Sequence, residues 1–268
     1  MSTSLSPIGM FDSGVGGLTV MREVMRALPN ESIIYMGDTA RIPYGNKSPD
    51  TIIRYSLENT SFLLNHKIKL LIVACYTASS SALESIRQHF GIPVIGVIEP
   101  GAEKAASITK NQRIGVLGTR ATIQSKAYQA NLFRLLPQSK VISIACPLFV
   151  HLVEESFASH SATRLIIQEY LKSLQGEQID TLLLGCTHYP FLRDQIQQEV
   201  GPNVSLVDSG QSCAEAVSSL LKQHQMEAPP TQQATYDFFV SDDPLKFREL
   251  GERLFGMRLP SVKQIIPA

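Results

Sequence analysis

Two stretches of the sequence decide the fold: residues 70–80 read LLIVACYTASS, and residues 181–190 read TLLLGCTHYP. Each begins with a short apolar run of the kind that forms a buried strand. A cysteine follows in each, Cys75 and Cys186, and then come residues that favour the start of a helix, Thr and Ser in the first stretch and Pro190 in the second. Both stretches therefore predict the same unit, a strand that ends near a cysteine and turns into a helix.

Two further pairs of segments extend this similarity along the chain. The pairs are IGMFDSGVGG at 8–17 with IGVLGTRAT at 114–122, and GVIEPGAE at 96–103 with SLVDSGQS at 205–212. Corresponding positions in the three pairs are 106 to 111 residues apart. Chance could explain any single pair, but three pairs in one order at a nearly constant offset predict two similar α/β halves.

The rest of the chain alternates short apolar runs with longer amphipathic stretches. We expect strands at 8–11, 32–36, 70–74, 93–97, 113–117, 140–144, 180–184 and 204–207. Helical patterns include 49–66, 78–90, 163–175 and 191–200. Such alternation is typical of parallel sheets covered by helices. The polar, Pro-containing residues 222–235 predict a linker before a last strand at 235–240 and a last helix at 243–255.

The composition limits the class of protein. The 268 residues include 24 Lys and Arg and 24 Asp and Glu, and this zero net charge argues against a nucleic-acid or membrane binder. Hydrophobic residues make up 44%, as in a compact globular protein. The longest apolar run, 70–75, is too short to span a membrane, and no basic residue precedes Arg22 as a signal peptide would require. The four cysteines contain no CxxC pair, so we expect a cytoplasmic protein without a disulfide framework or a zinc site.

Several polar residues stand close to the ends of predicted strands, where ligands of open α/β sheets bind. They are Asp12, Ser13, Cys75, Thr119 and Cys186. The two halves would then face each other across a cleft, and each would contribute one cysteine. Racemisation demands a proton acceptor on one side of a carbon and a donor on the other, since a single base returns the proton to the side it came from.

Cysteine suits this chemistry because a helix N-terminus or a nearby cation lowers the thiol pKa, about 8.5 in water, into the working range. The alternative is that Cys75 and Cys186 are small buried hydrophobic residues, the usual state of a free cysteine. Their matched positions in two half-sites favour the functional interpretation. Cys146 and Cys213 lack such neighbours, and we expect them to be packing residues.

Two turns complete the candidate site. Residues 12–17 (DSGVGG) lack the third glycine of a dinucleotide fingerprint, because Thr19 stands in its place, and they lack the Gly-Lys-Ser/Thr of a P-loop. We expect this turn to present backbone N–H groups, the Asp12 carboxylate and the Ser13 hydroxyl to a small ligand, with a purely structural turn as the alternative. Residues 43–45 (PYG) predict a second turn that places the Tyr44 phenol over a pocket.

Together these motifs resemble the glutamate racemase family, cofactor-independent enzymes that supply D-glutamate for peptidoglycan. The resemblance runs from about residue 8 to residue 221 and rests on FDSGVGGLTV, GDTARIPYG, VACYTAS, GVLGTRATI, CPLFVHLVEE and LLLGCTHYPFL in this order. It implies two similar α/β domains with mainly parallel sheets, related by a pseudo-twofold axis, and an active site in the cleft between them. We expect residues 1–97 and 210–268 to form the first domain and residues 98–209 the second.

The resemblance also implies roles for individual residues. Cys75 would take the α-proton from D-glutamate, and Cys186 would take it from L-glutamate. Asp12 would assist Cys75, and His188, with Glu154 as a helper, would assist Cys186. Contacts with the substrate are expected from Asp12, Ser13, Tyr44, Gly45, Tyr76, Thr77, Thr187 and His188.

Two residues depart from the family pattern. The family has Asn after the first cysteine, whereas this chain has Tyr76, so that a phenol replaces an amide with two donors. If its side chain faces the cleft, we expect Tyr76 to weaken the contact with the substrate. His151 stands where the family has proline, and we interpret it as a local variation of the loop.

No cofactor or metal is expected. Cys186 and His188 alone fall short of a metal-ligand set, and no lysine stands at a strand end as pyridoxal chemistry would require. Glutamate is the expected partner, with neither nucleic acid nor membrane, and the oligomeric state is open, with a homodimer among the options. The alternative functions are a racemase of the same superfamily for aspartate or another amino acid, and a ligand-binding paralogue with weak catalysis. A cysteine hydrolase would leave the second cysteine without a role.

Overall fold

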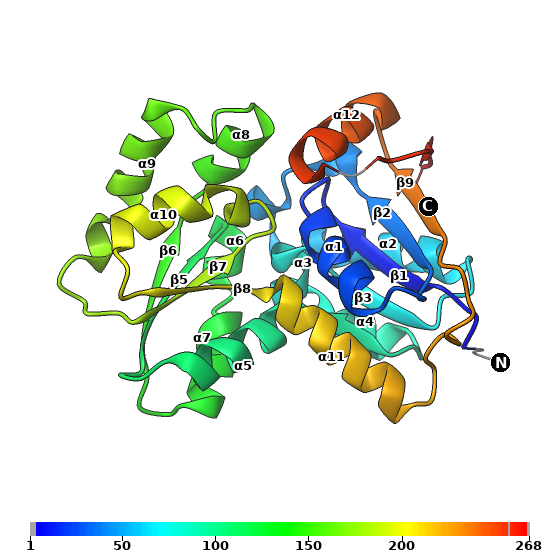
Figure 1. Cartoon of the computed structure of the whole chain (residues 1–268), viewed down its shortest axis with the longest axis horizontal. Coiled ribbons are helices and arrows are strands. Elements are labelled where there is room, and N and C mark those ends of the chain that lie inside the picture. Colours follow the sequence, from blue (N-terminus) through cyan, green and yellow to red (C-terminus); the bar gives the residue numbers. More distant parts are fainter. Residues whose placement is uncertain (1–3, 257, 267–268) are drawn as a thin grey trace.

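The computed structural model describes residues 4–256 and 258–266, which form two parallel sheets side by side (Figure 1). The strands are β1 (Ile8–Asp12), β2 (Ile33–Gly37), β3 (Leu70–Val73), β4 (Val94–Gly96), β5 (Arg113–Gly118), β6 (Lys140–Ala145), β7 (Thr181–Gly185), β8 (Ser205–Asp208), β9 (Tyr236–Val240) and β10 (Val262–Gln264). The first sheet has the order β10-β9-β2-β1-β3-β4, and the second has the order β6-β5-β7-β8.

Helices connect successive strands along most of the chain. The α-helices are α1 (Leu18–Ala27), α2 (Pro49–Leu64), α3 (Tyr76–Ser81), α4 (Leu83–His89), α5 (Ile98–Ile108), α6 (Arg120–Gln124), α7 (Ala127–Leu135), α8 (Leu148–Glu154), α9 (Ser161–Leu171), α10 (Arg193–Val200), α11 (Ser209–Gln223) and α12 (Pro244–Phe255). Short 3₁₀ helices are η1 (Thr39–Arg41), η2 (Tyr44–Asn46), η3 (Lys172–Leu174) and η4 (Tyr189–Leu192).

The predicted internal repeat is visible in the topology. Strands β2-β1-β3-β4 of the first sheet and β6-β5-β7-β8 of the second follow the same order, and every pairing is parallel. The first sheet is longer because β9 and β10 add to β2 at its edge. The prediction of an α/β fold with two similar halves and parallel sheets is confirmed.

Both faces of each sheet are covered, which explains why the strands are continuous apolar runs. In β1, Ile8 and Met10 pack into one cluster with residues of α1 and α11, whereas Phe11 packs on the opposite face with residues of α2. In the second sheet the corresponding covers are α5 and α7 on one face and α8, α9 and α10 on the other. The cluster around α1, α5 and α11 contains residues of both sheets, so the two halves share one apolar core on that side.

The chain crosses between the sheets twice. Strands from residues 8–96 and 236–264 belong to the first sheet, and those from residues 113–208 belong to the second. Helix α5 lies in the connection from β4 to β5, and α11 lies in the connection from β8 to β9. The two helices pack against each other. Figure 1 shows α11 running from the end of β8 back beneath the first sheet. The division into domains at residues 97 and 209 stays a prediction.

The predicted helix at 78–90 is wrong in its start and in its continuity. The helix begins at Tyr76 and is interrupted at Ala82, so that α3 and α4 are separate. The Ser79 hydroxyl donates to the Val73 carbonyl (2.7 Å) and accepts from the Val97 N–H (3.2 Å). These bonds tie the first turn to the ends of β3 and β4, and the chain then departs in a new direction.

Candidate active site

The site lies where the strand order of both sheets changes direction. In the first sheet the chain leaves β1 toward β2 on one side, whereas β3 lies on the other side, and the second sheet repeats this arrangement with β5 and β7. Residues that follow such strands meet in a crevice at the carboxyl edge of the sheet. Here the two crevices face each other and enclose a cavity of about 260 Å³. It is lined by Ser13, Gly14, Ile42, Pro43, Tyr44, Gly45, Cys75, Tyr76, Thr77, Thr119, Val150, His151, Glu154, Cys186, Thr187 and His188.

The two cysteines line this cavity from different halves of the protein. Cys75 follows β3 in the first sheet and Cys186 follows β7 in the second. The residues are 5% and 6% exposed, so their thiols face the cavity and are shielded from bulk water. Two proton-transfer groups that reach one small molecule from two sides are the arrangement that racemisation demands.

Cys75 is held as a thiol. It occupies the N-cap position of α3, and its Sγ lies 3.8 Å from the Ser13 Oγ. Burial, together with the negative charge of Asp12, raises the pKa of Cys75 to about 12, although hydrogen bonds from Ala78 and Ser13 act in the opposite direction. Cys75 is therefore protonated at neutral pH.

Asp12 lies behind the wall of the cavity instead of lining it. It is fully buried at the end of β1, where its Oδ2 accepts from the Gly14 N–H (2.9 Å) and its Oδ1 has no hydrogen-bond partner among the described residues. Burial raises the pKa of Asp12, and the charge of His188 opposes this shift. The carboxyl group thus influences Cys75 through its charge, and the predicted direct contact with the substrate would require it to move.

Cys186 is paired with a basic group. Its Sγ lies 3.9 Å from the Nδ1 of His188, and the Nε2 of the same ring lies 2.8 Å from the Glu154 Oε1. Burial alone would lower the pKa of His188, but the hydrogen bonds and charges of Cys186 and Glu154 outweigh it and raise this pKa to about 10. His188 is consequently an imidazolium at neutral pH, and a thiolate at Cys186 has a cation beside it.

Hydroxyl groups line the boundary between the two halves. The Oγ1 atoms of Thr77 and Thr119 lie 2.9 Å apart, and Thr122 lies behind them at 2.9 Å from Thr119. On the other side the Thr187 Oγ1 lies 3.3 Å from the His188 Nδ1. These hydroxyls, with that of Ser13, are available to hold the charged groups of a small polar ligand.

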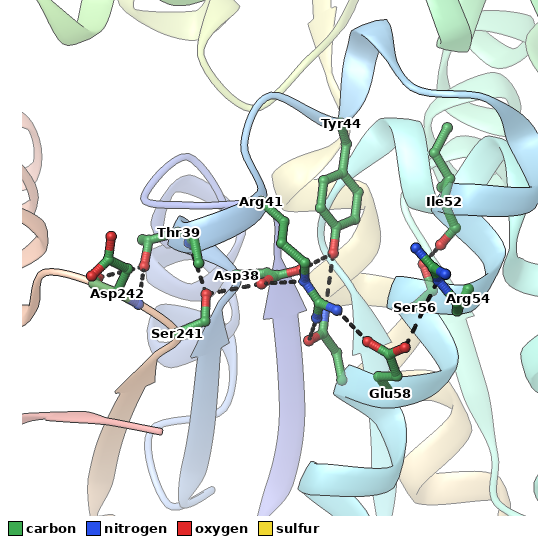
Figure 2. A network of polar contacts seen from close by, with 12 residues as sticks. Asp38, Thr39, Arg41, Tyr44, Ile52, Arg54, Ser56, Glu58, Ser241 and Asp242 are labelled. Atoms are coloured by element: carbon green, nitrogen blue, oxygen red, sulfur yellow. Dashed lines mark hydrogen bonds and ion pairs between the residues drawn. The ribbon is translucent and has the colours of Figure 1, made fainter. Parts of the chain in front are cut away.

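Tyr44 and Gly45, from the second predicted turn at residues 43–45, also line the cavity. Gly45 packs so closely against Thr119 that a Cβ on the glycine would lie 2.6 Å from the Thr119 Cβ. The Tyr44 hydroxyl does not point into the cavity, because it donates to the buried Asp38 carboxylate and accepts from the Asn59 amide at 3.1 Å (Figure 2). Its ring and backbone face the cavity, whereas its hydroxyl is used in the protein interior.

Tyr76, the departure from the family pattern, takes part in both the cavity and the core. It is 3% exposed and lines the cavity beside Cys75. Its hydroxyl accepts a hydrogen bond from the Ser209 N–H (3.1 Å) at the start of α11. The Ser209 Oγ lies 3.1 Å from the Tyr128 hydroxyl of α7, so Tyr76 contributes to the polar contacts between the two halves.

The sequence did not identify all lining residues. Thr119 was noted at a strand end but was not assigned to substrate binding, although the repeat pairs its segment with the turn at Asp12. His151, interpreted as loop variation, lies at the cavity together with Val150. Gly14, Ile42 and Pro43 stand inside the quoted motifs but carry no polar side chain that would have marked them.

No helix within residues 4–256 and 258–266 is long and apolar enough to cross a membrane. Within the same ranges, no group of three or more His, Cys, Asp and Glu side chains is arranged to hold a metal ion.

Comparisons with known proteins agree with this geometry. The profile of the family described as Asp/Glu/hydantoin racemase matches residues 8–217. A glutamate racemase of Geobacter metallireducens is 49% identical over 258 residues, which cover 96% of each chain. One of Chlorobaculum tepidum is also 49% identical, over 98% of this chain and 97% of the relative.

Solved structures show the same similarity. A crystal structure of a glutamate racemase from Bacillus anthracis superposes with a TM-score of 0.93, at 40% identity and 97% coverage of both chains. A glutamate racemase from Francisella tularensis, in complex with D-glutamate, gives 0.92 at 37% identity and 98% coverage of both. An aspartate racemase from Picrophilus torridus gives 0.60 at 16% identity, which shows a common fold alone. The chain therefore belongs to the Asp/Glu/hydantoin racemase family and, within it, to the glutamate racemases, which interconvert L- and D-glutamate.

Proposed function

We propose that glutamate is racemised here by a two-base mechanism in which Cys75 and Cys186 exchange the α-proton from opposite sides of the substrate. The observation that supports it most directly is the position of the two thiols, which lie at the ends of equivalent strands in the two halves and line one cavity. The Francisella relative is described as holding D-glutamate, and we place the substrate of this chain in the corresponding cavity.

Each turnover moves one proton in and one proton out. With L-glutamate, the Cys186 thiolate takes the α-proton and becomes a thiol, and the electron pair of the broken C–H bond stays on the α-carbon. The Cys75 thiol then gives its proton to the opposite face of that carbon and becomes a thiolate. D-glutamate follows the same steps in reverse, so atoms and charge balance in both directions.

The charges around the two cysteines favour the protonation state that L-glutamate requires. His188 supplies a positive charge beside Cys186, whereas burial and Asp12 keep Cys75 protonated. Glu154 holds the imidazole ring in place and maintains its charge. For D-glutamate the proton must first leave Cys75, and the Asp12 carboxylate, held just behind the wall, is the group whose charge opposes a second anion there.

Close contact between the two halves excludes water from the reacting carbon. Gly16 lies directly against the second half, because a Cβ on it would meet the Thr187 Oγ1 and would lie 2.6 Å from the His188 ring. Gly45 makes the corresponding contact with Thr119. In such a shielded site the hydroxyls and charges act more strongly on the developing carbanion than they would in water. The cofactor-free reaction and the cytoplasmic location expected from the sequence stay predictions, and a homodimer stays one option for the oligomeric state.

Substitution of either cysteine tests the mechanism. Cys75→Ser and Cys186→Ser should each lower kcat/KM by about 10²–10⁴-fold, because a serine hydroxyl is a far weaker acid than a thiol. Circular dichroism of L- and D-glutamate, without added cofactor, measures the reaction in both directions. Cys213→Ala is the matched control, since Cys213 is buried in the core outside the cavity, and it should keep wild-type racemisation. Near-wild-type activity of either serine variant would disprove the two-base proposal.

The pH dependence should follow from the charges in the site. Activity with L-glutamate requires a thiolate at Cys186, a thiol at Cys75 and an imidazolium at His188. Acid removes the base that the reaction requires, and rising pH removes the His188 proton near its pKa of about 10, so we expect a bell-shaped kcat/KM profile. The limbs belong to the coupled site and not to single groups. Because the equilibrium constant between enantiomers is one, the profiles for L- and D-glutamate should superimpose.

The variant His188→Asn distinguishes titration of the enzyme from titration of the substrate amine in this experiment. It removes the imidazolium but leaves the amine of glutamate unchanged, so the alkaline limb should move relative to wild type. A wild-type rate that rises steadily to high pH, or an alkaline limb that is unaffected by His188→Asn, would contradict the assigned protonation state.

Gly16→Ala should damage the reaction without unfolding the protein. The added methyl group must displace Thr187 and His188, and a misplacement of about 1 Å near a reacting group costs about a hundredfold in rate. Gly91→Ala is the control, because a Cβ at Gly91 meets no atom within 4 Å. Steady-state kinetics of both variants, with thermal unfolding to verify folding, decide the point. A Gly16→Ala enzyme as active as Gly91→Ala would show that the close contact is not needed.

A further inference from the structure

A buried carboxylate, Asp38, stands directly after β2 and is outside the cavity. Its side chain is fully buried and accepts hydrogen bonds from three sides (Figure 2). The Arg41 Nε donates to both of its oxygens (2.9 and 2.7 Å), the Ser241 Oγ donates to Oδ1 (2.9 Å), and the Tyr44 hydroxyl donates to Oδ2. Two segments, residues 41–44 and the residue after β9, therefore converge on one charge.

The first of these segments forms a wall of the cavity. Residues 42–45 follow η1 and include Ile42, Pro43, Tyr44 and Gly45, all of which line the cavity. The Tyr44 hydroxyl is fixed from two sides, by Asp38 and by the Nδ2 of Asn59 from α2 (3.1 Å). This hydroxyl is the tip of the side chain. Its two hydrogen bonds therefore determine how far Tyr44 extends toward the cavity.

The second segment is the C-terminal end of β9. The Ser241 Oγ donates to Asp38 and accepts from the Ala40 N–H (2.8 Å). The Thr39 Oγ1 donates to the Asp242 carbonyl (2.5 Å) and accepts from the Asp242 N–H (2.8 Å). The two residues that follow β9, Ser241 and Asp242, are thus bound to η1. Ser241 also binds Asp38, which directly precedes η1.

Arg41 adds a second carboxylate to the network. Its guanidinium pairs with Glu58 as well as with Asp38, donates to the Asn59 Oδ1 (3.2 Å) and lies 4.1 Å from the centre of the Tyr55 ring. Glu58 contacts neither Tyr44 nor Ser241 in any hydrogen bond or ion pair of the described residues. The two carboxylates therefore share a cation, but of the two only Asp38 also binds Tyr44 and Ser241 among the described residues.

The position of residues 43–45 also affects the contact with the second half of the protein. Gly45 packs against Thr119, and the Thr119 hydroxyl bonds with that of Thr77 beside Cys75. A shift of residues 43–45 would thus change both the space for the substrate and the contact between the two halves.

We propose that Asp38 is a positioning residue for glutamate binding: it fixes the depth of the wall at residues 43–45 by holding Tyr44, Arg41 and the tail residue Ser241 together. This inference rests on the proposed function, because it assigns the cavity to glutamate. Asp38 touches no reacting atom, so its loss should weaken substrate binding more than the proton transfer itself.

The test compares Asp38→Asn with the matched control Glu58→Gln. Both remove one negative charge from the same guanidinium, but only the first loosens Tyr44 and Ser241. We expect Asp38→Asn to raise KM for both enantiomers about tenfold, since hydrogen bonds to a buried charge are among the stronger ones, while kcat changes less. Glu58→Gln should keep KM within about twofold of wild type. A purely structural role would lower kcat through loss of folded enzyme and leave KM unchanged, and that result would overturn the proposal.

Two milder variants keep the test decisive if Asp38→Asn does not fold. Tyr44→Phe and Ser241→Ala each remove one hydroxyl that contacts Asp38 and keep the Asp38–Arg41 pair. Each should raise KM in the same direction, and unchanged KM in both would overturn the proposal. Calorimetric titration with D-glutamate reports binding separately from turnover, because the interconversion of two enantiomers releases no net heat. If wild type binds D-glutamate but does not racemise it, the proposed mechanism fails, and a weaker binding constant in these variants still supports the role of Asp38.

Discussion

Two buried thiols that exchange one proton across a cavity must hold their protons differently, and the charged groups around Cys75 and Cys186 differ accordingly. Cys186 has an imidazolium beside it, supported by Glu154, whereas Cys75 has a buried carboxyl group, Asp12, behind it. Burial raises the pKa of Cys75, and the hydrogen bonds from Ala78 and Ser13 offset only part of that effect. In the proposed mechanism this asymmetry separates a base from an acid in two half-sites that are otherwise built alike.

The duplicated topology is what brings the two thiols together. Strands β1 and β3 in the first half and β5 and β7 in the second are neighbours in sheets of the same order, so each half opens a crevice at the same place. The shared apolar core on the side of α5 and α11 holds the halves edge to edge with these crevices opposed. At the cavity, Gly16 and Gly45 allow the two halves to approach each other closely. The hydrogen bonds of Asp38 hold the cavity wall at residues 43–45.

Much of this could be predicted from the sequence because it is local. A strand that ends in a cysteine before a helix is readable twice in the chain, and the equal spacing of the repeat predicts two such units. What could not be predicted depends on contacts between distant residues. The position of Asp12 behind the wall, the bond from the Tyr76 hydroxyl to Ser209 and the contact of Thr119 with Gly45 all require knowledge of how the halves meet. The break at Ala82 was missed for the same reason, since Ser79 bonds to the ends of two strands.

The most direct test of the central claim follows the α-proton itself. L-glutamate is incubated with the enzyme in D₂O, and both enantiomers are separated at low conversion and analysed for deuterium at the α-carbon. Two opposed thiols predict deuterium in the D-glutamate formed, delivered from Cys75, and almost none in the remaining L-glutamate, whose proton leaves to Cys186. Deuterium that enters the remaining L-glutamate as fast as product forms would show a single base that serves both faces, and would contradict the account.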